Sequence, residues 1–414
     1  MSRLDELIAE LCPDGVEFKP LWSVTIWDKK FNAVDRRKQP KVYNYPYLLA
    51  KDLFALEVEG GDVFLLSTGE QTGWTLEEIA GDNMCEGEVV TIPWGKSRAV
   101  VDCIKYYKGK FVTADNRIMT SNDTDILSNK YLYYWIMTQG DLIDSFYRGS
   151  GIKHPDMAKV LELKIPVPPL EVQREIVRIL DNFTELTAEL TAELTARKQQ
   201  YKVYCRKLIE ELSDAKDTCI GDLGSWSGGS TPSMSNKEFW EDGTFPWVSS
   251  KDMKVSVLTD TEDHVTQKAL DNTSIKLLPT DVVAIVARSG ILKHTLPIVY
   301  IPVQVTVNQD IKALVCKEGI LPKYVFFALQ GYHDELLAKT KKQGGTVDSL
   351  EIKKFMDFKI PVPSYKEQQR IVDILTRFDT LCNDISSGLP AEIVARQKQY
   401  EYYRDKLLTF KQLA

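Results

Sequence analysis

The chain contains one unit of about 195–200 residues twice, and this duplication constrains its fold more than any other feature. Residues 164–180 read KIPVPPLEVQREIVRIL, and 195 positions later residues 359–375 read KIPVPSYKEQQRIVDIL. The segment ARKQQYKVYCRKL (196–208) matches ARQKQYEYYRDKL (395–407) at an offset of 199. GEVVTIP (87–93) aligns more weakly with TDVVAIV (280–286). A length of 414 residues therefore suits two similar domains, each followed by a well-matched segment.

The repeat pattern is nearly circular. LDELIAEL (4–11) resembles LIEEL (208–212), which ends the first well-matched segment. The N-terminal stretch therefore looks like the tail of a helical segment whose body lies at the other end of the chain. We expect the two ends of the chain to meet.

The weakly matched part of each unit shows short β-type runs separated by turn-rich loops, followed by a short amphipathic helix. This pattern predicts an α+β domain with a twisted, partly antiparallel sheet. The expected strands are residues 63–66, 89–93, 111–113, 282–286 and 298–301, and the expected short helices are residues 130–137 and 323–329.

The well-matched segments predict long helices. Proline disfavours helix in the I-P-V-P stretch, so that stretch is expected to be extended. Apolar residues then recur every three or four positions, which predicts one helix over residues 171–212, about 60 Å long. The second copy is interrupted by Gly388 and Pro390, and Pro390 suits the first position of a new helix. A single apolar stripe needs a partner, and we expect the two copies to pack antiparallel about a pseudo-two-fold axis.

A tetrapeptide repeat makes the pattern more specific. Residues 184–195 read TEL-TAEL-TAEL-T, which keeps Leu186, Leu190 and Leu194 near one helical stripe. Together with the duplicated unit and the I-P-V-P-x-x-x-x-Q segments, these residues resemble the DNA specificity subunit of type I restriction–modification enzymes. The TAEL units point to the type IC branch.

The resemblance implies a domain plan and a function. It implies two α/β target-recognition domains (1–165, with an N-terminal helix near the C-terminus, and 215–360). It also implies a central spacer helix with TAEL repeats (166–214) and a C-terminal spacer helix (361–414). Each domain would read one half of a split double-stranded DNA site, and the helices would set the gap.

The same resemblance implies the partners. Two modification subunits would dock on the helices and methylate adenine with S-adenosylmethionine, and restriction subunits would add ATP- and Mg²⁺-dependent translocation and cleavage. This chain itself would need no cofactor or metal.

No catalytic motif is visible in the sequence. It lacks a G-x-x-x-x-G-K-[ST] loop, an adenine-methyltransferase motif and metal-ligand spacing of its four histidines. Its seven cysteines never form C-x-x-C, which suits a reducing cytoplasm. A net charge of −7 argues against a freestanding nucleic-acid binder, so local basic patches or partner subunits must supply the positive field. An enzyme with its own recognition domain and a protein-binding scaffold remain as alternatives.

Candidate DNA contacts lie in loops at repeat-equivalent positions, after the aligned strands and around Gly149 and Gly344. Arginine could contact guanine, lysine would mostly hold phosphate, and the segment PWVSSKDM (246–253) adds a serine and a lysine. The candidates are Lys96, Arg98, Arg148, Lys153, Ser249, Lys251, Arg288, Lys293, Lys341 and Lys342. For the spacer and for partner docking, the candidates are Leu186, Leu190, Leu194, Tyr201, Phe378 and Tyr400.

Overall fold

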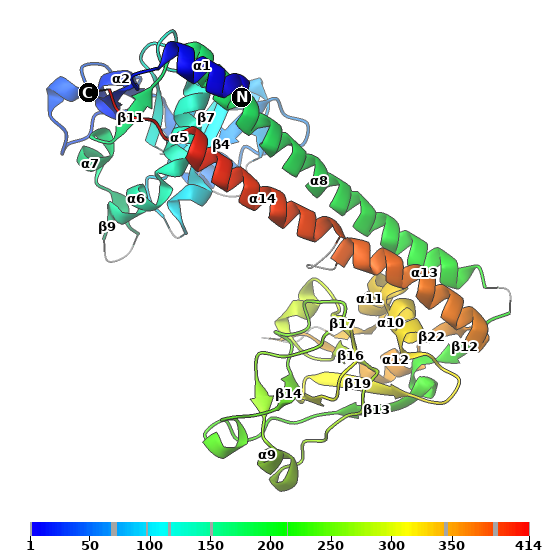
Figure 1. Ribbon diagram of the computed structural model, residues 1–414. Coiled ribbons are helices and arrows are strands. Elements are labelled where there is room, and N and C mark those ends of the chain that lie inside the picture. Colours follow the sequence, from blue (N-terminus) through cyan, green and yellow to red (C-terminus); the bar gives the residue numbers. More distant parts are fainter. Residues whose placement is uncertain are drawn as a thin grey trace. The chain divides into compact units, whose positions relative to one another are not determined.

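The computed structural model describes residues 2–67, 73–96, 98–114, 117–149, 152–212, 214–342, 347–383 and 388–413. The chain divides into two compact units. Unit 1 comprises Met1–Thr187 and Arg396–Ala414, and unit 2 comprises Ala188–Ala395. Each unit contains a globular domain together with part of the long helices (Figure 1).

The globular domain of unit 1 is built on a seven-stranded mixed sheet. The long antiparallel pair β6–β7 forms its centre, and the helix α5 (Asn129–Thr138) packs on it with buried aromatic residues. The strand order is β2 (Thr25–Trp27), β8 (Arg117–Ser121), β6 (Cys85–Ile92), β7 (Lys105–Ala114), β4 (Val63–Leu66) and β5 (Trp74–Thr75), with β3 (Tyr47–Leu48) beside β7.

The globular domain of unit 2 has a four-stranded antiparallel sheet and a smaller three-stranded one. All five residues of β16 are buried, as expected for a central strand of β-branched residues. The first sheet has the order β13 (Gly224–Gly228), β19 (Ile311–Cys316), β16 (Val282–Val286) and β17 (Ile298–Ile301). The second has the order β15 (His264–Val265), β14 (Phe245–Val248) and β18 (Thr306–Val307), and α10 (Pro322–Gly331) packs on β16 and β17.

The I-P-V-P segments are extended, as predicted, and each forms a strand. β11 (Lys164–Val167) pairs with β1 (Glu17–Pro20), and β22 (Lys359–Val362) pairs with β12 (Lys216–Cys219). Both are two-stranded antiparallel ribbons, so every strand is an edge strand and tolerates proline.

The glutamine of the repeated motif is buried in both units and joins the strand, the helix start and a loop. Gln173 Nε2 donates to the carbonyls of Pro168 and Ile126, both at 2.7 Å, and its Oε1 accepts the N–H of Ser128 at 2.9 Å. Gln368 repeats this, donating to Pro363 O at 3.0 Å and accepting the N–H of Leu321 at 2.8 Å. The repeat thus places a glutamine at the same position in each unit, where its side chain forms hydrogen bonds with buried backbone groups.

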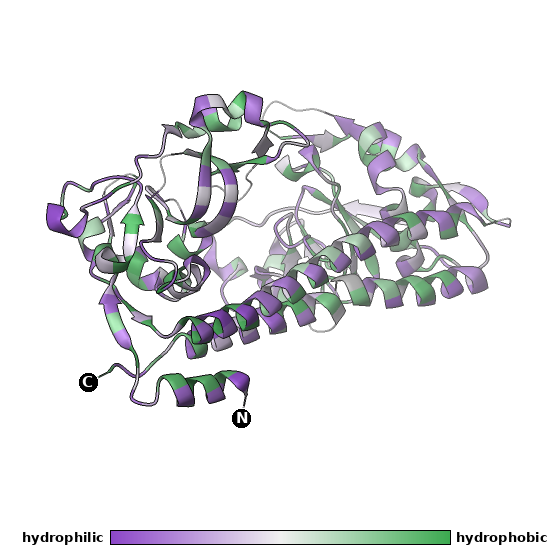
Figure 2. Ribbon diagram, turned by 90° about the horizontal axis from the view of Figure 1, so that it is seen from above, coloured by the Kyte–Doolittle hydropathy of each residue, from purple (hydrophilic) through white to green (hydrophobic). Residues whose placement is uncertain are grey.

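The long helices form where the periodicity predicts them. α8 (Leu170–Glu210) is one continuous helix of 41 residues, and the second copy forms α13 (Tyr365–Asn383) and α14 (Gly388–Leu407). Pro390 is the third residue of α14 and not the first as expected, but it still lies in the first turn, where a missing N–H costs no helical bond. Figure 2 shows green and purple residues alternating along these helices. In the described part of the chain, no helix combines the length and apolarity needed to cross a bilayer.

The two ends of the chain meet within unit 1, as predicted. The N–H of Val16 donates to Lys411 O, and the N–H of Leu413 donates to Val16 O, both at 2.9 Å. Gly15, at φ +114°, permits this approach, because a Cβ there would stand 2.6 Å from Lys411 O. Leu4 of α1 (Arg3–Leu11) shares a core with Leu408.

Candidate nucleic-acid interface

In unit 1 the loop after β6 meets a short hairpin. The hairpin consists of β9 (Tyr147–Arg148) and β10 (His154–Pro155), and Arg148 lies opposite His154. The N–H of Lys96 donates to Lys153 O at 3.3 Å, which joins the loop to the hairpin. Two groups of cations that are far apart in the sequence therefore lie together.

Unit 2 repeats this loop–hairpin arrangement. β20 (Lys341–Lys342) pairs with β21 (Ser349–Leu350), and Arg288 forms an isolated bridge with Ser349. The Lys341 ammonium donates to Lys293 O at 3.4 Å. Gly344, the aligned glycine that Lys341 and Lys342 were expected to flank, lies outside the described residues.

Two of the predicted contacts are arginines with largely exposed side chains. The Arg148 side chain is 67% exposed and lies 3.9 Å from Asp156, and that of Arg288 is 66% exposed and lies 4.0 Å from Asp310. Such long, solvated ion pairs are weak, so each guanidinium can turn to another acceptor at little cost. Lys153, Lys293 and Lys342 are also exposed.

Three predicted contacts are already engaged inside their own domain. Lys96 is only 11% exposed and pairs with Asp144, whose pKa its ammonium lowers. Ser249 is buried, and its hydroxyl donates to Asp252 at 2.8 Å. We therefore remove Lys96 and Ser249 from the proposed contact set.

Lys251 is also removed from the proposed contact set, because two carboxylates of its own domain already bind its ammonium. Its ammonium lies 2.9 Å from Glu262 and 2.8 Å from Asp263, and hydrogen bonds to these carboxylates raise its pKa. Arg98 is half-buried, with Nε 3.2 Å from Cys103 Sγ, and Lys341 is half-buried beside Asp348. Both residues stay in the proposed contact set.

The structure adds a pocket that the sequence prediction missed. Its volume is about 590 Å³, and its lining includes Arg117 of β8, which lies 5.3 Å from the ring centroid of Phe31 and 5.9 Å from that of Trp94. Arg117 begins β8 and has uncharged residues on either side in the sequence, so no local signal marked it. The cations that line this pocket are Lys29, Lys30, Arg117 and Arg148, with His154 beside them.

A buried carboxyl group lies next to this pocket. Asp28 is 5% exposed, accepts the N–H of Ile118 at 3.3 Å, and has the Lys29 ammonium 3.5 Å away. Burial outweighs these favourable contacts and raises the pKa of Asp28 to about 6.

The predicted spacer residues take different environments. Tyr201 is buried in the core of unit 2, and Phe378 packs against that core. Leu190, Leu194 and Tyr400 are half-buried, whereas Leu186 is exposed. The exposed large apolar residues of the long helices are Leu186, Val203, Tyr204, Tyr365, Leu381, Val394, Tyr402 and Tyr403.

Among the residues that the structure describes, no group of three or more His, Cys, Asp or Glu could hold a metal ion.

The class of protein follows from these features: a duplicated α+β domain mounted on long paired helices, with basic loop–hairpin surfaces. The family model described as type I restriction modification DNA specificity domain matches residues 32–197 and again residues 213–395. The chain belongs to this family and is a specificity subunit of a type I restriction–modification system.

Known proteins give the same result. The chain is 46% identical over 421 residues to the type I restriction enzyme EcoR124I/EcoR124II specificity subunit of Escherichia coli, covering 99% of this chain and 97% of that protein. The fold is similar to that of a type I restriction–modification system S subunit from M. genitalium, with a TM-score of 0.55 at 17% identity, covering 95% and 96% of the two chains. A second solved structure, from work on complex assembly and conformational transition of the type I system, has a TM-score of 0.54 at 15% identity and covers 78% of this chain and 82% of its own.

Proposed function

We propose that the chain reads a bipartite double-stranded DNA site, with one globular domain on each half. The observation that carries this proposal is the repeated loop–hairpin surface, which presents Arg148 in unit 1 and Arg288 in unit 2. An exposed arginine can contact guanine through two hydrogen bonds, and lysines nearby hold phosphates. The DNA contact set is Arg98, Arg148, Lys153, Arg288, Lys293, Lys341 and Lys342, with Arg117, Lys29 and Lys30 added.

The long helices set the gap between the half-sites and dock two modification subunits. Exposed tyrosine side chains on these helices support docking, since aromatic residues are enriched in protein–protein interfaces. The adenine methyltransferase chemistry, with S-adenosylmethionine, then belongs to those subunits, and ATP and Mg²⁺ belong to the restriction subunits. The chain itself is non-catalytic and works in the cytoplasm. Partner subunits also supply the positive field that a chain of net charge −7 lacks.

The test is to express the chain with a modification subunit and sequence the methylated adenines. A two-part motif with a fixed gap is expected. Methylation or cleavage by the purified chain alone would favour the enzyme alternative. Absence of DNA binding even with the partner would favour the protein-binding scaffold.

A further inference from the structure

In each unit a short helix of the globular domain faces a long helix, and the polar contacts between the two helices differ from one unit to the other. In unit 1, Lys130 of α5 pairs with Asp181 of α8 at 2.8 Å, and the Tyr134 hydroxyl donates to the same carboxylate at 2.6 Å. The Lys130 ammonium also lies 5.5 Å from the ring centroid of Tyr106, whose hydroxyl donates to Glu88 at 2.7 Å. One carboxylate from the long helix thus satisfies two polar groups.

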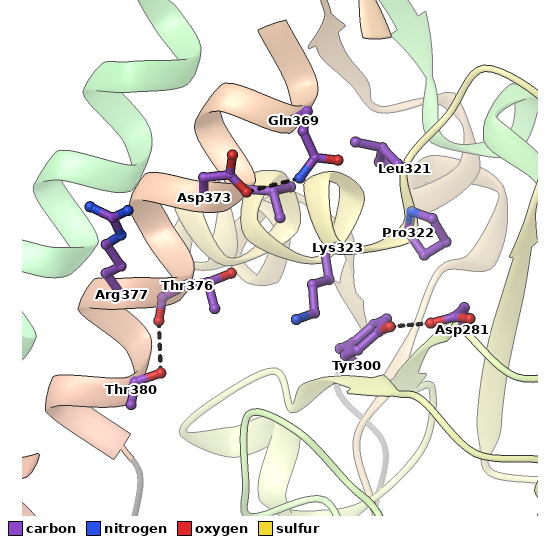
Figure 3. Close-up of a pocket in the computed structure, with 11 residues that line it drawn as sticks. Asp281, Tyr300, Leu321, Pro322, Lys323, Gln369, Asp373, Thr376, Arg377 and Thr380 are labelled. Atoms are coloured by element: carbon purple, nitrogen blue, oxygen red, sulfur yellow. Dashed lines mark hydrogen bonds between the residues drawn. The ribbon is translucent and has the colours of Figure 1, made fainter. Parts of the chain in front are cut away.

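Unit 2 keeps only half of this cluster. Lys323 lies 5.3 Å from the ring centroid of Tyr300, and the Tyr300 hydroxyl donates to Asp281 (Figure 3). The repeat alignment, however, puts Thr376 at the position of Asp181 and Phe327 at that of Tyr134. Across the described ranges, Lys323 forms no ion pair.

A cavity of about 830 Å³ opens where the carboxylate is missing. Figure 3 shows the Lys323 side chain extending into the space beside Thr376 and Thr380. The Thr376 hydroxyl is buried and has no hydrogen-bond partner among the described residues. The nearby Asp373 carboxylate already accepts a hydrogen bond from Gln369 at 2.9 Å. The Lys323 ammonium therefore lines a cavity in which no carboxylate pairs with it, because the carboxylates of Asp281 and Asp373 accept hydrogen bonds from Tyr300 and Gln369 instead.

We propose that this cavity receives a carboxylate side chain, Asp or Glu, from the modification subunit that docks on unit 2. Unit 1 fills the equivalent place with a carboxylate carried on a helix, which identifies the chemistry that matches the lysine. The cavity is many times larger than a free carboxylate ion, so a side chain with its neighbours fills it better. The inference rests on the proposed docking of modification subunits, and it makes the two docking sites chemically different.

The first experiment measures the affinity of the full chain for modification subunits, by titration with native mass spectrometry. Lys323→Met removes the charge, and Thr376→Asp recreates the internal pair that unit 1 has. Each variant is expected to weaken one of the two binding events by about tenfold and leave the other unchanged. The double variant is expected to bind more weakly than Lys323→Met alone, because the introduced carboxylate then has no ammonium to pair with and repels the partner's carboxylate. Lys276→Met, an exposed lysine of unit 2 outside the cavity lining, is the matched control.

The outcomes separate this inference from the proposed function. Two unchanged binding events in both variants would overturn the inference and leave the function standing, whereas a wild-type chain that binds no modification subunit would overturn the function itself. Thermal unfolding of the isolated chain checks folding, and Thr376→Asp is expected to melt no lower than wild type. Acetate serves as a probe for a free carboxylate. If millimolar acetate raises the melting temperature of the wild-type chain but not that of Lys323→Met, the cavity binds a free carboxylate, and the proposal that a partner side chain enters it is overturned.

Discussion

The ring of Phe183 in α8 stacks on that of Tyr403 in α14, with centroids 5.5 Å apart and planes 22° apart. In unit 2, Tyr204 of α8 contacts Phe378 of α13 at 5.6 Å. Phe183 matches Phe378 in the repeat, and Tyr204 matches Tyr403. Each unit therefore holds the same aromatic pair, made from one residue of each copy, as the predicted pairing of the two copies requires.

The aromatic pair should be energetically coupled. In a double-mutant cycle with Phe183→Ala and Tyr403→Ala, the free energies of unfolding should show a coupling of about 1 kcal/mol. The cycle of Phe183→Ala with Tyr204→Ala is the control, and its coupling should be near zero. Equal coupling in both cycles would contradict the observed pairing.

Replacing either motif glutamine should destabilise its own unit. Gln173→Leu and Gln368→Leu each leave buried carbonyl and N–H groups without partners, which costs roughly 1–3 kcal/mol or more. Hydrogen exchange should show increased opening at Ser128 in the first variant and at Leu321 in the second. Increased opening at both sites in either variant would argue against independent roles.

Shortening the TAEL segment should change the gap and not the half-sites. Deleting residues 191–194 removes about 6 Å of α8 and rotates the remainder of the helix by about 40°. Sequencing of methylated sites should then show the same two half-sites with a different spacing. Altered half-sites with an unaltered gap would reject the spacer role.

The two exposed arginines should act on different halves. Arg288→Ala should lower the preference for the correct base in one half-site, measured by methylation, by about tenfold, which is the discrimination expected from one guanine contact. Arg148→Ala should have the same effect on the other half-site. Lys237→Ala, an exposed lysine paired with Glu241, is the control and should leave both halves unchanged. An equal loss over both halves from either arginine would disprove its assignment.

Asp28 should make folding depend on pH. Its pKa is about 6 in the folded chain and about 3.9 when unfolded, so the folded form binds the proton more tightly. Its stabilising contribution is complete below about pH 4 and is lost as the pH rises through about 6. Asp28→Asn should therefore raise the free energy of unfolding at pH 7.5 by up to roughly 3 kcal/mol. Urea unfolding at pH 4 and 7.5 measures this, and an unchanged pH dependence would refute it.

The sequence predicted the architecture well because the duplicated segments are helices and buried strands. The periodicity of these segments can be read from neighbouring residues. Two helices with one apolar stripe each have few ways to bury those stripes other than by packing on each other. The meeting of the chain ends followed from the circular repeat, and Val16 and Lys411 confirm it.

The availability of the candidate contact residues was predictable only in part. Repeat-equivalent loops pointed to Arg148 and Arg288, whose side chains are exposed, but the sequence did not show that Lys96 is held by Asp144 or that Ser249 donates to Asp252. Arg117 escaped notice because the residues that frame it come from other segments of the chain.

The sequence by itself determined the duplication, the long helices and the family, since these depend on residue order and periodicity. Only the tertiary structure decided which cations are exposed and where the second copy lacks the carboxylate that would pair with Lys323. The physical reason is that a charged side chain's availability depends on which carboxylates and rings lie within a few ångströms, and those neighbours are brought by distant parts of the chain.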